Sequence, residues 1–421
     1  MTDEKPFITN IQRNRDVALA LLKPSQRDLE HGLALHRECL VAESYSLGLC
    51  APAVAGPLNA ELDAGASAIE FKDLYEDQTM RNWATTPALR EEYRHAWEAS
   101  GVSCMFLNAG EEGNDPGLLL RRLARYTWLM DTMPDILSRA TTAAHIRKNH
   151  REGKRSICFS LNGVPLPGRN LNPQDELREI KVFAQLGARM MHLTYQRRNP
   201  IGDGCGESQD GGLSDFGRVV IAEMNRLGVI IDLAHTGWRT CCEAARASAL
   251  PLLVSHSAVH ALSAHIRGKP DEVIKAVLDS GGTMGITNYP AFLGLSGDIL
   301  ALLDHLDYMV KKFGDDSVTI GTDAAYRASG CDAALQQLRW PHSRPRWENL
   351  WPEGALSDPQ FNRPEQQQSL AWTNWPLFTV GMVQRGFSEE TIRKIVGGNL
   401  LRVVEANETH RSATAAGEDK G

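Results

Sequence analysis

Short apolar runs of strand length alternate with helical patterns along most of this chain. Eight such runs are present, at residues 39–43, 102–108, 156–161, 189–194, 229–234, 252–255, 283–288 and 317–322. The runs are nearly continuously apolar, which is typical of parallel strands buried on both faces. Alternation of strands with helices predicts right-handed crossovers and hence a parallel sheet. Eight units fit an α/β fold of the closed (β/α)8 TIM type, and an open doubly wound sheet is the less favoured alternative.

Several helices between these runs carry recognisable boundary signals. Residues 175–186 have apolar side chains at helical spacing. Ser214 is a good N-cap for a helix that Gly228 would end. Pro270 stands at the start of another helix, which we expect to end near Gly281. These segments are predicted to belong to the helical layer around the barrel.

The remaining parts of the chain fall outside this alternation. We expect residues 1–24 to be an N-terminal extension, residues 25–406 a single barrel domain, and residues 407–421 a polar, disordered tail. Within the domain, residues 327–364 are rich in Pro, Trp and Arg and have no clean period. This insertion is predicted to be a long ordered loop or lid, because its Trp side chains need somewhere to pack.

Composition narrows the class of protein. The chain is 42% hydrophobic and 23% charged, as expected for a soluble globular enzyme with a large core, and its formal net charge of −7 argues against nucleic acid or an anionic membrane as a partner. None of the eight cysteines forms a Cys-x-x-Cys pair, which indicates reduced thiols. The sequence shows neither a signal-like N-terminus nor an apolar stretch of the roughly 18 to 20 residues that span a bilayer. We therefore expect a cytoplasmic protein.

Three of the predicted strands are followed directly by side chains that bind metals. These are His235, His256 and Asp323. The carboxyl ends of the strands meet at one mouth of a barrel, where such enzymes place their sites. Two imidazoles and a carboxylate suit zinc, which activates a water and polarises a carbonyl. A buried, hydrogen-bonded His is the ordinary alternative for either imidazole alone.

Longer motifs surround these side chains. They are Gly212-Leu-Ser-Asp-Phe-Gly-Arg218, Glu223-Met-Asn-Arg-Leu-Gly-Val229, Ile231-Asp-Leu-Ala-His235, Val254-Ser-His-Ser257, His265-Ile-Arg-Gly-Lys-Pro-Asp271, Tyr289-Pro-Ala-Phe292, Ile320-Gly-Thr-Asp323 and Gly398-Asn-Leu-Leu-Arg402. Each motif alone is modest. In this order and spacing, over about residues 25–405, the chain resembles the renal or membrane dipeptidase family, peptidase family M19, whose fold is a metallo-dependent hydrolase-like barrel.

The resemblance implies a hydrolase that uses zinc to cleave the amide bond of a dipeptide or a related small amide. It implies that His235 and His256 bind one zinc ion, and that Asp323 binds the other zinc ion and carries protons during hydrolysis. Arg267 matches an Arg that holds the substrate carboxylate, a task suited to a guanidinium. Tyr289 matches a Tyr of the substrate pocket. Members of the family are often dimers, so a homodimer is also expected.

Four positions depart from the family pattern. Tyr45 and Leu47 stand where the family has a His-x-Asp pair that binds the first zinc ion. Asn162 replaces a bridging Glu, and an amide oxygen is an uncharged, weak ligand. Tyr195 replaces a pocket His that helps to polarise the scissile carbonyl, a role that a phenol can also fill by donating to the oxyanion.

These departures leave few carboxylates for a pair of cations, whose repulsion needs several anionic ligands. We therefore expect a single zinc ion on His235 and His256, completed by Asp323 or water, with Asn162 as a weak further ligand. Tyr45 would then contact the substrate.

Two other arrangements stay open for the metal. One is a metal-free site. The other is a two-metal centre rebuilt from further side chains, for which the candidates are Glu43, Cys50, Glu111 and Glu112. His192 is expected to play a structural role, because period-2 alternation places it on the strand face opposite Tyr195, toward the helical layer.

Two other classes of function compete with amide hydrolysis. A lyase, decarboxylase or other non-peptidase enzyme could use the same barrel, since one fold supports many reactions. A protein that binds a carboxylate without catalysis is the third possibility. The survival of Asp323 together with both histidines argues against this third possibility.

Overall fold

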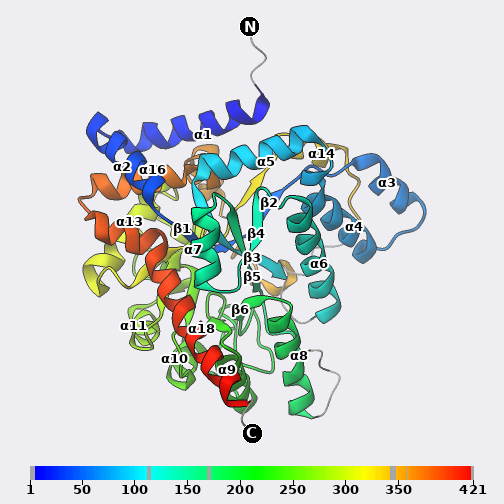
Figure 1. The fold of residues 1–421 in the computed structure, drawn as a ribbon, viewed down its shortest axis with the longest axis vertical. Helices are drawn as coiled ribbons and strands as arrows, with labels where there is room; N and C mark the ends of the chain where they lie inside the picture. Colours follow the sequence, from blue (N-terminus) through cyan, green and yellow to red (C-terminus); the bar gives the residue numbers. More distant parts are fainter. Residues whose placement is uncertain are drawn as a thin grey trace.

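The computed structural model describes residues 5–110, 115–166, 168, 172–341, 348–356 and 358–418. A curved sheet of parallel strands forms its centre, and helices surround the sheet (Figure 1). None of the described helices combines the length and the apolar character that a bilayer crossing requires.

Eight parallel strands build the barrel. They are β1 Val41–Ser46, β3 Val102–Gly110, β5 Arg155–Leu161, β6 Ala188–His192, β7 Ile230–Asp232, β8 Leu253–Val259, β10 Thr283–Ile286 and β11 Val318–Ile320. Neighbours in this order are hydrogen-bonded, and each pair is parallel. Each strand overlaps one of the eight apolar runs, so the predicted (β/α)8 barrel is confirmed.

The first and last strands meet just beyond their carboxyl ends. The backbone N–H of Asp323 donates to the carbonyl of Tyr45 at 3.3 Å, and that of Leu47 donates to the carbonyl of Ala324 at 3.1 Å. The ring of strands is therefore nearly closed. Four short strands lie outside this ring: β2 Gly48–Cys50, β4 Leu137–Arg139, β9 Gly268–Lys269 and β12 Ala325–Arg327.

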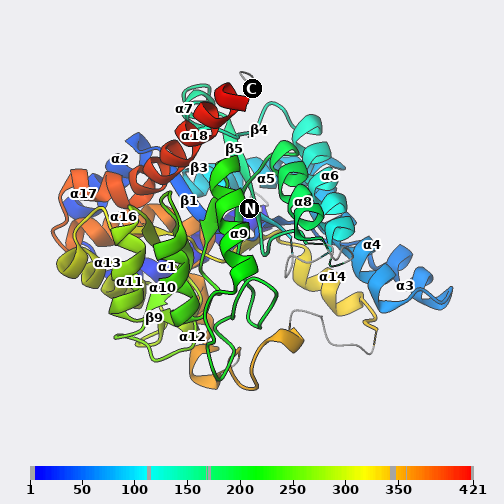
Figure 2. The same ribbon diagram turned by 90° about the horizontal axis from the view of Figure 1, so that it is seen from below.

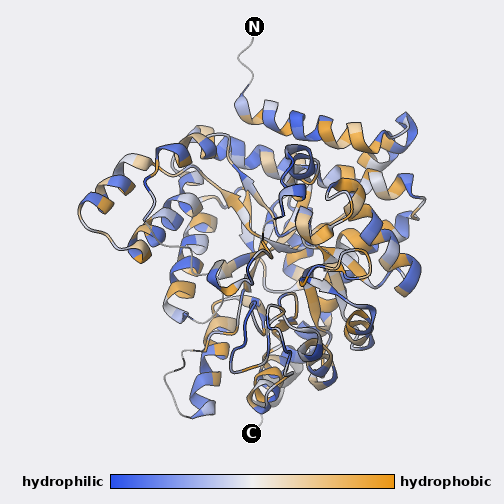
Figure 3. Cartoon of the chain, turned by 180° about the vertical axis from the view of Figure 1, so that it is seen from behind, coloured by the Kyte–Doolittle hydropathy of each residue, from blue (hydrophilic) through white to orange (hydrophobic). Residues whose placement is uncertain are grey.

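Helices on the outside cover the strands (Figure 2). The longer ones are α5 Pro87–Ser100, α6 Pro116–Thr132, α7 Ala143–Arg151, α8 Pro173–Gln185, α9 Asp215–Leu227, α10 Trp238–Ala247, α11 Asp271–Asp279, α13 Ile299–Phe313, α16 Trp375–Gln384 and α18 Asn399–Glu418. The predicted boundaries of α9 are confirmed, because the Ser214 hydroxyl accepts the N–H of Gly217 and Gly228 ends the helix at a φ of 60°. Many helices carry both hydrophobic and hydrophilic residues, as expected for elements with one face against the sheet (Figure 3).

Further helices complete the shell. They are α1 Pro6–Leu22, α2 Gln26–Glu38, α3 Ala55–Asp63, α4 Ala68–Arg81, α12 Pro290–Leu293, α14 Cys331–Gln337, α15 Pro364–Ser369, α17 Glu389–Arg393 and the short turns η1 Asn82–Ala84, η2 Glu348–Leu350, η3 Pro359–Phe361, η4 Trp372–Asn374 and η5 Lys394–Gly398. α1, from the expected N-terminal extension, lies along the outside and contacts α13, α15 and α16 (Figure 1).

The C-terminal segment differs from the expectation of a disordered tail. α18 continues through residue 407 to Glu418 and packs beside α9 (Figures 1 and 2). The Asn407 amide donates to the carbonyls of Pro251 and Val403, both at 2.9 Å. Arg411 donates to the carbonyl of Thr141 at 3.4 Å. These contacts with the barrel hold a helix that the polar composition alone did not indicate.

Small residues inside the barrel allow its strands to approach closely below the site. A Cβ atom at Gly285 or Gly321 would collide with the carbonyl of Ser255 and with the hydroxyl of Ser44. Ser44 donates to that same carbonyl at 2.6 Å. The polar layer under the site therefore depends on two positions that tolerate only glycine.

Candidate active site

His235 and His256 come from the neighbouring strands β7 and β8 and face one another. His256 belongs to β8, and His235 follows β7 in a tight turn that the Asp232 carboxylate holds by accepting the N–H of Ala234 at 3.0 Å. The two Nε2 atoms are 3.0 Å apart, and both side chains are buried. Two distant parts of the sequence thus bring their imidazoles to one point.

The opposite ring nitrogens of the two histidines are anchored. Nδ1 of His256 lies 2.8 Å from the Ser255 hydroxyl, and Nδ1 of His235 lies 3.0 Å from the Gln196 amide nitrogen. The amide oxygen of Gln196 accepts a hydrogen bond from Cys205 at 2.7 Å. Burial, and after it the positive charge of Arg267, lowers the pKa values of both histidines well below the usual range. Both rings are therefore neutral, which is the form that binds metals.

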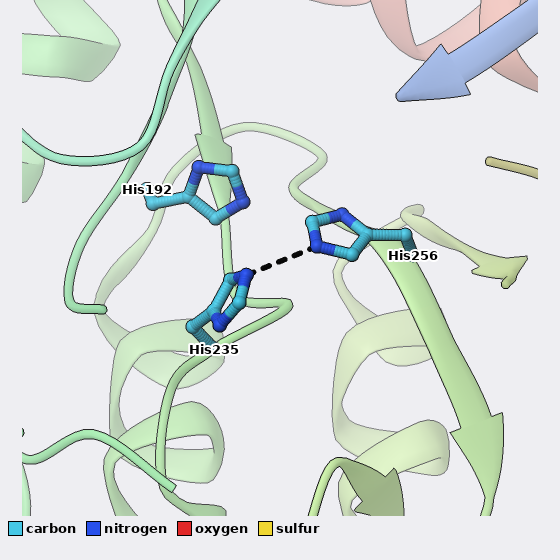
Figure 4. A group of neighbouring side chains, drawn as sticks. All are labelled: His192, His235 and His256. Carbon is cyan, nitrogen blue, oxygen red and sulfur yellow. Dashed lines mark hydrogen bonds between the residues drawn. The ribbon is translucent and has the colours of Figure 1, made fainter. Parts of the chain in front are cut away.

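His192 is the third member of this group, which corrects the expectation that it faces the helical layer. Its ring centroid lies 5.3 Å from that of His235 and 5.5 Å from that of His256. The three rings each direct a nitrogen toward the space between them (Figure 4). β6 ends at His192, so the alternation used to place it against Tyr195 does not continue over those residues.

A buried carboxylate lies beside His192. Nε2 of His192 is 2.9 Å from Oδ2 of Asp232, and both side chains are fully buried. Burial alone would raise the pKa of Asp232, but His192 and the hydrogen bond from Ser255 hold it below its usual value. Asp232 therefore carries a negative charge at the base of the site.

Tyr45 contacts both Asn162 and the histidines. The Tyr45 hydroxyl donates to Oδ1 of Asn162 at 2.6 Å. Its ring stacks on His256 with centroids 3.8 Å apart. Burial raises the pKa of Tyr45 well above its usual value, so its hydroxyl stays protonated and acts as a donor. The phenol thus fills the space next to the imidazoles.

Asp323 lies at the edge of the group. Its backbone has a φ of 55°, a conformation that side-chain-bearing residues rarely adopt, and its Oδ2 is 4.0 Å from Nε2 of His256. Burial raises the pKa of Asp323 to about 6, although the nearby Arg267 and His192 act to lower it. The carboxylate is 17% exposed, so it borders both the histidines and the mouth of the barrel.

Arg267 is completely buried behind the two facing histidines. One of its terminal nitrogens donates to the carbonyl of Ala234, and the other donates to the carbonyl of His256 at 2.8 Å. Its Nε forms no hydrogen bond with any described residue. The guanidinium therefore joins the two strand ends that carry His235 and His256.

The insertion predicted to form a lid covers the site with Trp351. The Trp351 indole N–H donates to the Tyr195 hydroxyl at 3.2 Å, and Tyr195 stacks on His235 with centroids 4.3 Å apart. Trp351 also stacks on Phe292, which packs against Tyr289. The Tyr289 hydroxyl donates to a carbonyl of the same insertion. Aromatic rings thus form one wall of the mouth.

Of the candidates for a rebuilt second metal site, two are placed elsewhere. Glu43 accepts hydrogen bonds from Thr322 and from the indole of Trp372, and Cys50 lies near Cys331 on the short strand β2. Glu111 and Glu112 lie outside the described residues. The sequence analysis did not place His192, Gln196 or Trp351 in the site. Of these three, His192 could have been identified, because it is a His near the end of a predicted strand.

The donor set fits one metal ion. Among the described residues, the His, Cys, Asp and Glu side chains with metal-ligand spacing are His192, His235 and His256, whose ligand atoms lie within 4.8 Å of one another. Asp323 is not part of this group. Binding through Nε2 of His235 requires its proton to lie on Nδ1, where the oxygen of Gln196 would accept it after a half turn of the amide.

Comparison with known proteins agrees with this architecture. A model of the membrane dipeptidase family, peptidase family M19, matches residues 86–336. The dipeptidase aclJ of Aspergillus oryzae is 24% identical over 316 residues, which cover 71% of this chain and 65% of that relative. The match thus spans slightly less than two thirds of the relative's length.

Solved structures show the same fold. An amidohydrolase from Pseudomonas aeruginosa is 24% identical, with a TM-score of 0.65 over 89% of this chain and 98% of its own. The probable dipeptidase PvdM from the same organism is 20% identical, with a TM-score of 0.65 over 92% and 100%. A metallopeptidase from Rhodobacter sphaeroides, solved with a phosphinate mimic of the dipeptide L-Ala-D-Ala, is 20% identical, with a TM-score of 0.58 over 77% and 96%. Because the family model covers more than half of the chain, this protein belongs to the membrane dipeptidase family, peptidase family M19.

Proposed function

We propose that this protein is a zinc-dependent hydrolase that cleaves the amide bond of a dipeptide or a related small amide. The observation that carries the proposal is the convergence of the His235 and His256 nitrogens, 3.0 Å apart, beside the Asp323 carboxylate at the mouth of the barrel. When bound there, the ion would lower the pKa of a water and polarise the scissile carbonyl. The dipeptidase relative and the structure with a dipeptide mimic support the substrate class.

Asp323 is the proton carrier in this proposal. A carboxylate with a pKa of about 6 is largely ionised at neutral pH and still basic enough to take a proton from the attacking water. It can then return the proton to the leaving amine. Its position next to His256, but outside the histidine group, suits a proton carrier better than a principal metal ligand.

Tyr195 and Arg267 are the proposed contacts to the substrate. Tyr195 stacks on His235, and its phenol can donate to the oxyanion that forms on the carbonyl. The Arg267 Nε has no hydrogen bond with the described residues. It is therefore the donor that we propose for a substrate carboxylate. Tyr45 and Tyr289 would line the pocket.

A reaction without hydrolysis is the second candidate. It is favoured by the Tyr45–Asn162 hydrogen bond, which places two uncharged side chains where the family pattern has metal ligands. A lyase or decarboxylase would convert a carboxylate substrate without cleaving a peptide bond. Analysis of the products by mass spectrometry separates the two candidates.

The direct test is an assay of zinc-loaded protein against a panel of dipeptides and N-acyl amino acids, with the His235→Asn, His256→Asn double variant as the matched control. We expect hydrolysis by the wild type and its loss in the control. A metal-loaded wild type that cleaves none of the panel would refute the proposal.

We also propose a cytoplasmic location, which the eight free thiols support.

A further inference from the structure

We propose that His192 is the third protein ligand of a mononuclear centre, so that three imidazoles, rather than two imidazoles and Asp323, hold the ion. This inference rests on the metal dependence of the proposed function and specifies its ligands. His192 is not among the metal ligands of the family pattern. The alternation of side chains along its strand predicted that it would face the helical layer.

The orientation of the three rings is the first argument. Each histidine has its Nδ1 anchored by a different neighbour: His192 by the carbonyl of Leu161 at 2.9 Å, His235 by Gln196 and His256 by Ser255. Anchoring one ring nitrogen fixes the direction of the other, as in established metal sites. The remaining Nε2 atoms point into one shared space (Figure 4).

The hydrogen bonding of His192 is the second argument. A carbonyl only accepts, so the contact with Leu161 places a proton on Nδ1 of His192. Nε2 is therefore the ring nitrogen of His192 that remains for a metal. Nε2 lies 2.9 Å from Oδ2 of Asp232, which is the distance of a buried ion pair. A proton on Nε2 satisfies this contact when no metal is bound, and a metal ion that displaces the proton would bind the same nitrogen beside the same carboxylate.

Asp232 is held so that it can offset the charge of such an ion. Its Oδ1 accepts the backbone N–H groups of Ala234 and Ser255, at 3.0 and 2.9 Å. Oδ2 is left facing His192, its partner in the β6–β7 register. The buried negative charge lowers the cost of placing a cation in the barrel.

The stoichiometry of one ion follows from the neighbouring side chains. Tyr45 lies against two of the three rings, with its centroid 3.8 Å from that of His256 and 5.5 Å from that of His192. Its hydroxyl is committed to Asn162 at 2.6 Å. This pair fills the space beside the imidazoles with neutral groups, at the positions where the family pattern has charged metal ligands.

The proposed set has the chemistry of a catalytic site. Three neutral imidazoles leave a fourth position of a zinc ion open to water, as in zinc enzymes with three histidine ligands. Asp323, whose Oδ2 is 4.0 Å from Nε2 of His256, would be the carboxylate available to a water on such an ion. His192 thus supplies a ligand in a site where Tyr45 and Asn162 stand at the positions of family ligands.

The test is metal binding, which needs no substrate. Metal-depleted protein is titrated with Zn²⁺ or Co²⁺, and the bound metal is measured by calorimetry and elemental analysis. In the His192→Asn variant, the amide can still donate to Leu161 but the second ring nitrogen is gone. We expect one equivalent in the wild type and an affinity lower by about 100-fold or more in the variant.

His36→Asn is the matched control. His36 is equally buried and is hydrogen-bonded to Thr379 and Ser100, far along the chain from the site. Its replacement is expected to leave metal affinity within about threefold of the wild type. Equal binding by wild type and His192→Asn, or two equivalents in the wild type, would overturn the proposal.

A measurement on the unaltered protein covers the case in which His192→Asn does not fold. Pulsed electron paramagnetic resonance of the Cu²⁺-loaded wild type counts the coordinated imidazoles. Three imidazoles support the proposal, and two overturn it. Protein that binds one ion through three imidazoles but cleaves no amide would refute the proposed function alone.

Discussion

Nε2 of His235 and Nε2 of His256 lie 3.0 Å apart, closer than two ligands of one zinc ion. With Zn–N bonds of 2.0 to 2.1 Å, two ligands of a tetrahedral ion are about 3.3 Å apart. The pair therefore needs to open by only a few tenths of an ångström to bind. Arg267 spans the backbone behind both rings and fixes the strand ends from which they project.

Replacing either His235 or His256 by Asn is expected to remove the metal. Each replacement deletes one Nε2 and leaves an incomplete set, so we expect metal content to fall below about a tenth of an equivalent and dipeptide hydrolysis to fall at least about 100-fold. Elemental analysis and initial rates measure the two effects. Unchanged metal content in either variant would contradict this assignment.

Tyr195→Phe tests the oxyanion contact. The phenol stacks on His235 and accepts the Trp351 N–H, so the ring of Phe would keep the packing while losing the donor. We expect kcat to fall about 100-fold with little change in KM, since the contact strengthens only in the transition state. Tyr308→Phe, which removes a hydroxyl bonded to Asp271 on the outer surface, is the control. A rise in KM at constant kcat would assign Tyr195 to substrate binding instead.

The lid is testable because the described part of its insertion contains two tryptophans in different environments. Trp351 is 8% exposed and stacks on Phe292, whereas Trp340 is 49% exposed and packs on Phe71 and Tyr75. We expect Trp351→Ala to raise KM about tenfold, in keeping with the loss of an aromatic wall. Trp340→Ala should leave KM unchanged. Equal effects of both changes would show that the whole insertion, rather than Trp351, shapes the site.

The sequence predicted the barrel and brought His235 and His256 to one mouth because both depend on local patterns. An apolar run defines a strand, and in a parallel barrel every strand ends at the same side. The position of Trp351 depends instead on the path of a long insertion without periodicity. The sequence therefore predicted only that the tryptophan side chains of this insertion would be packed.

His192 shows why regular patterns fail at a strand end. Alternation assumes an extended chain, but β6 stops at His192 and the next residues turn toward Gln196 and Tyr195. Both His192 and Tyr195 therefore reach the site, although alternation had separated them. The helical residues after 407 were missed for a related reason, because their partners lie on distant loops.

Arg267→Lys separates substrate docking from the support of the backbone. If the guanidinium binds a substrate carboxylate, wild type should prefer a dipeptide over its C-terminal amide, and Lys should reduce that preference at least about tenfold. Steady-state rates with both substrates give the ratio. A purely structural Arg267 predicts weaker metal binding in the variant with the preference unchanged.

Glu43 makes stability depend on pH. It is fully buried on β1, and burial raises its pKa to about 7 although hydrogen bonds from Thr322 and Trp372 act to lower it. An unfolded Glu has a pKa of about 4.3. The folded state therefore binds this proton more tightly, and the stabilisation is complete below about pH 4 and is lost as pH rises through 7.

We therefore expect the Glu43 contribution to the free energy of unfolding to fall by roughly 3 kcal/mol between pH 4.5 and pH 8. Gln cannot ionise, so the difference between wild type and Glu43→Gln should change over this range, whatever the cost of the substitution itself. Urea unfolding of metal-depleted protein at several pH values measures it. Glu390→Gln, at an exposed position on α17, should give a constant difference. A constant difference for Glu43→Gln as well would mean that the buried carboxylate stays ionised, held by its three donors against the cost of burial.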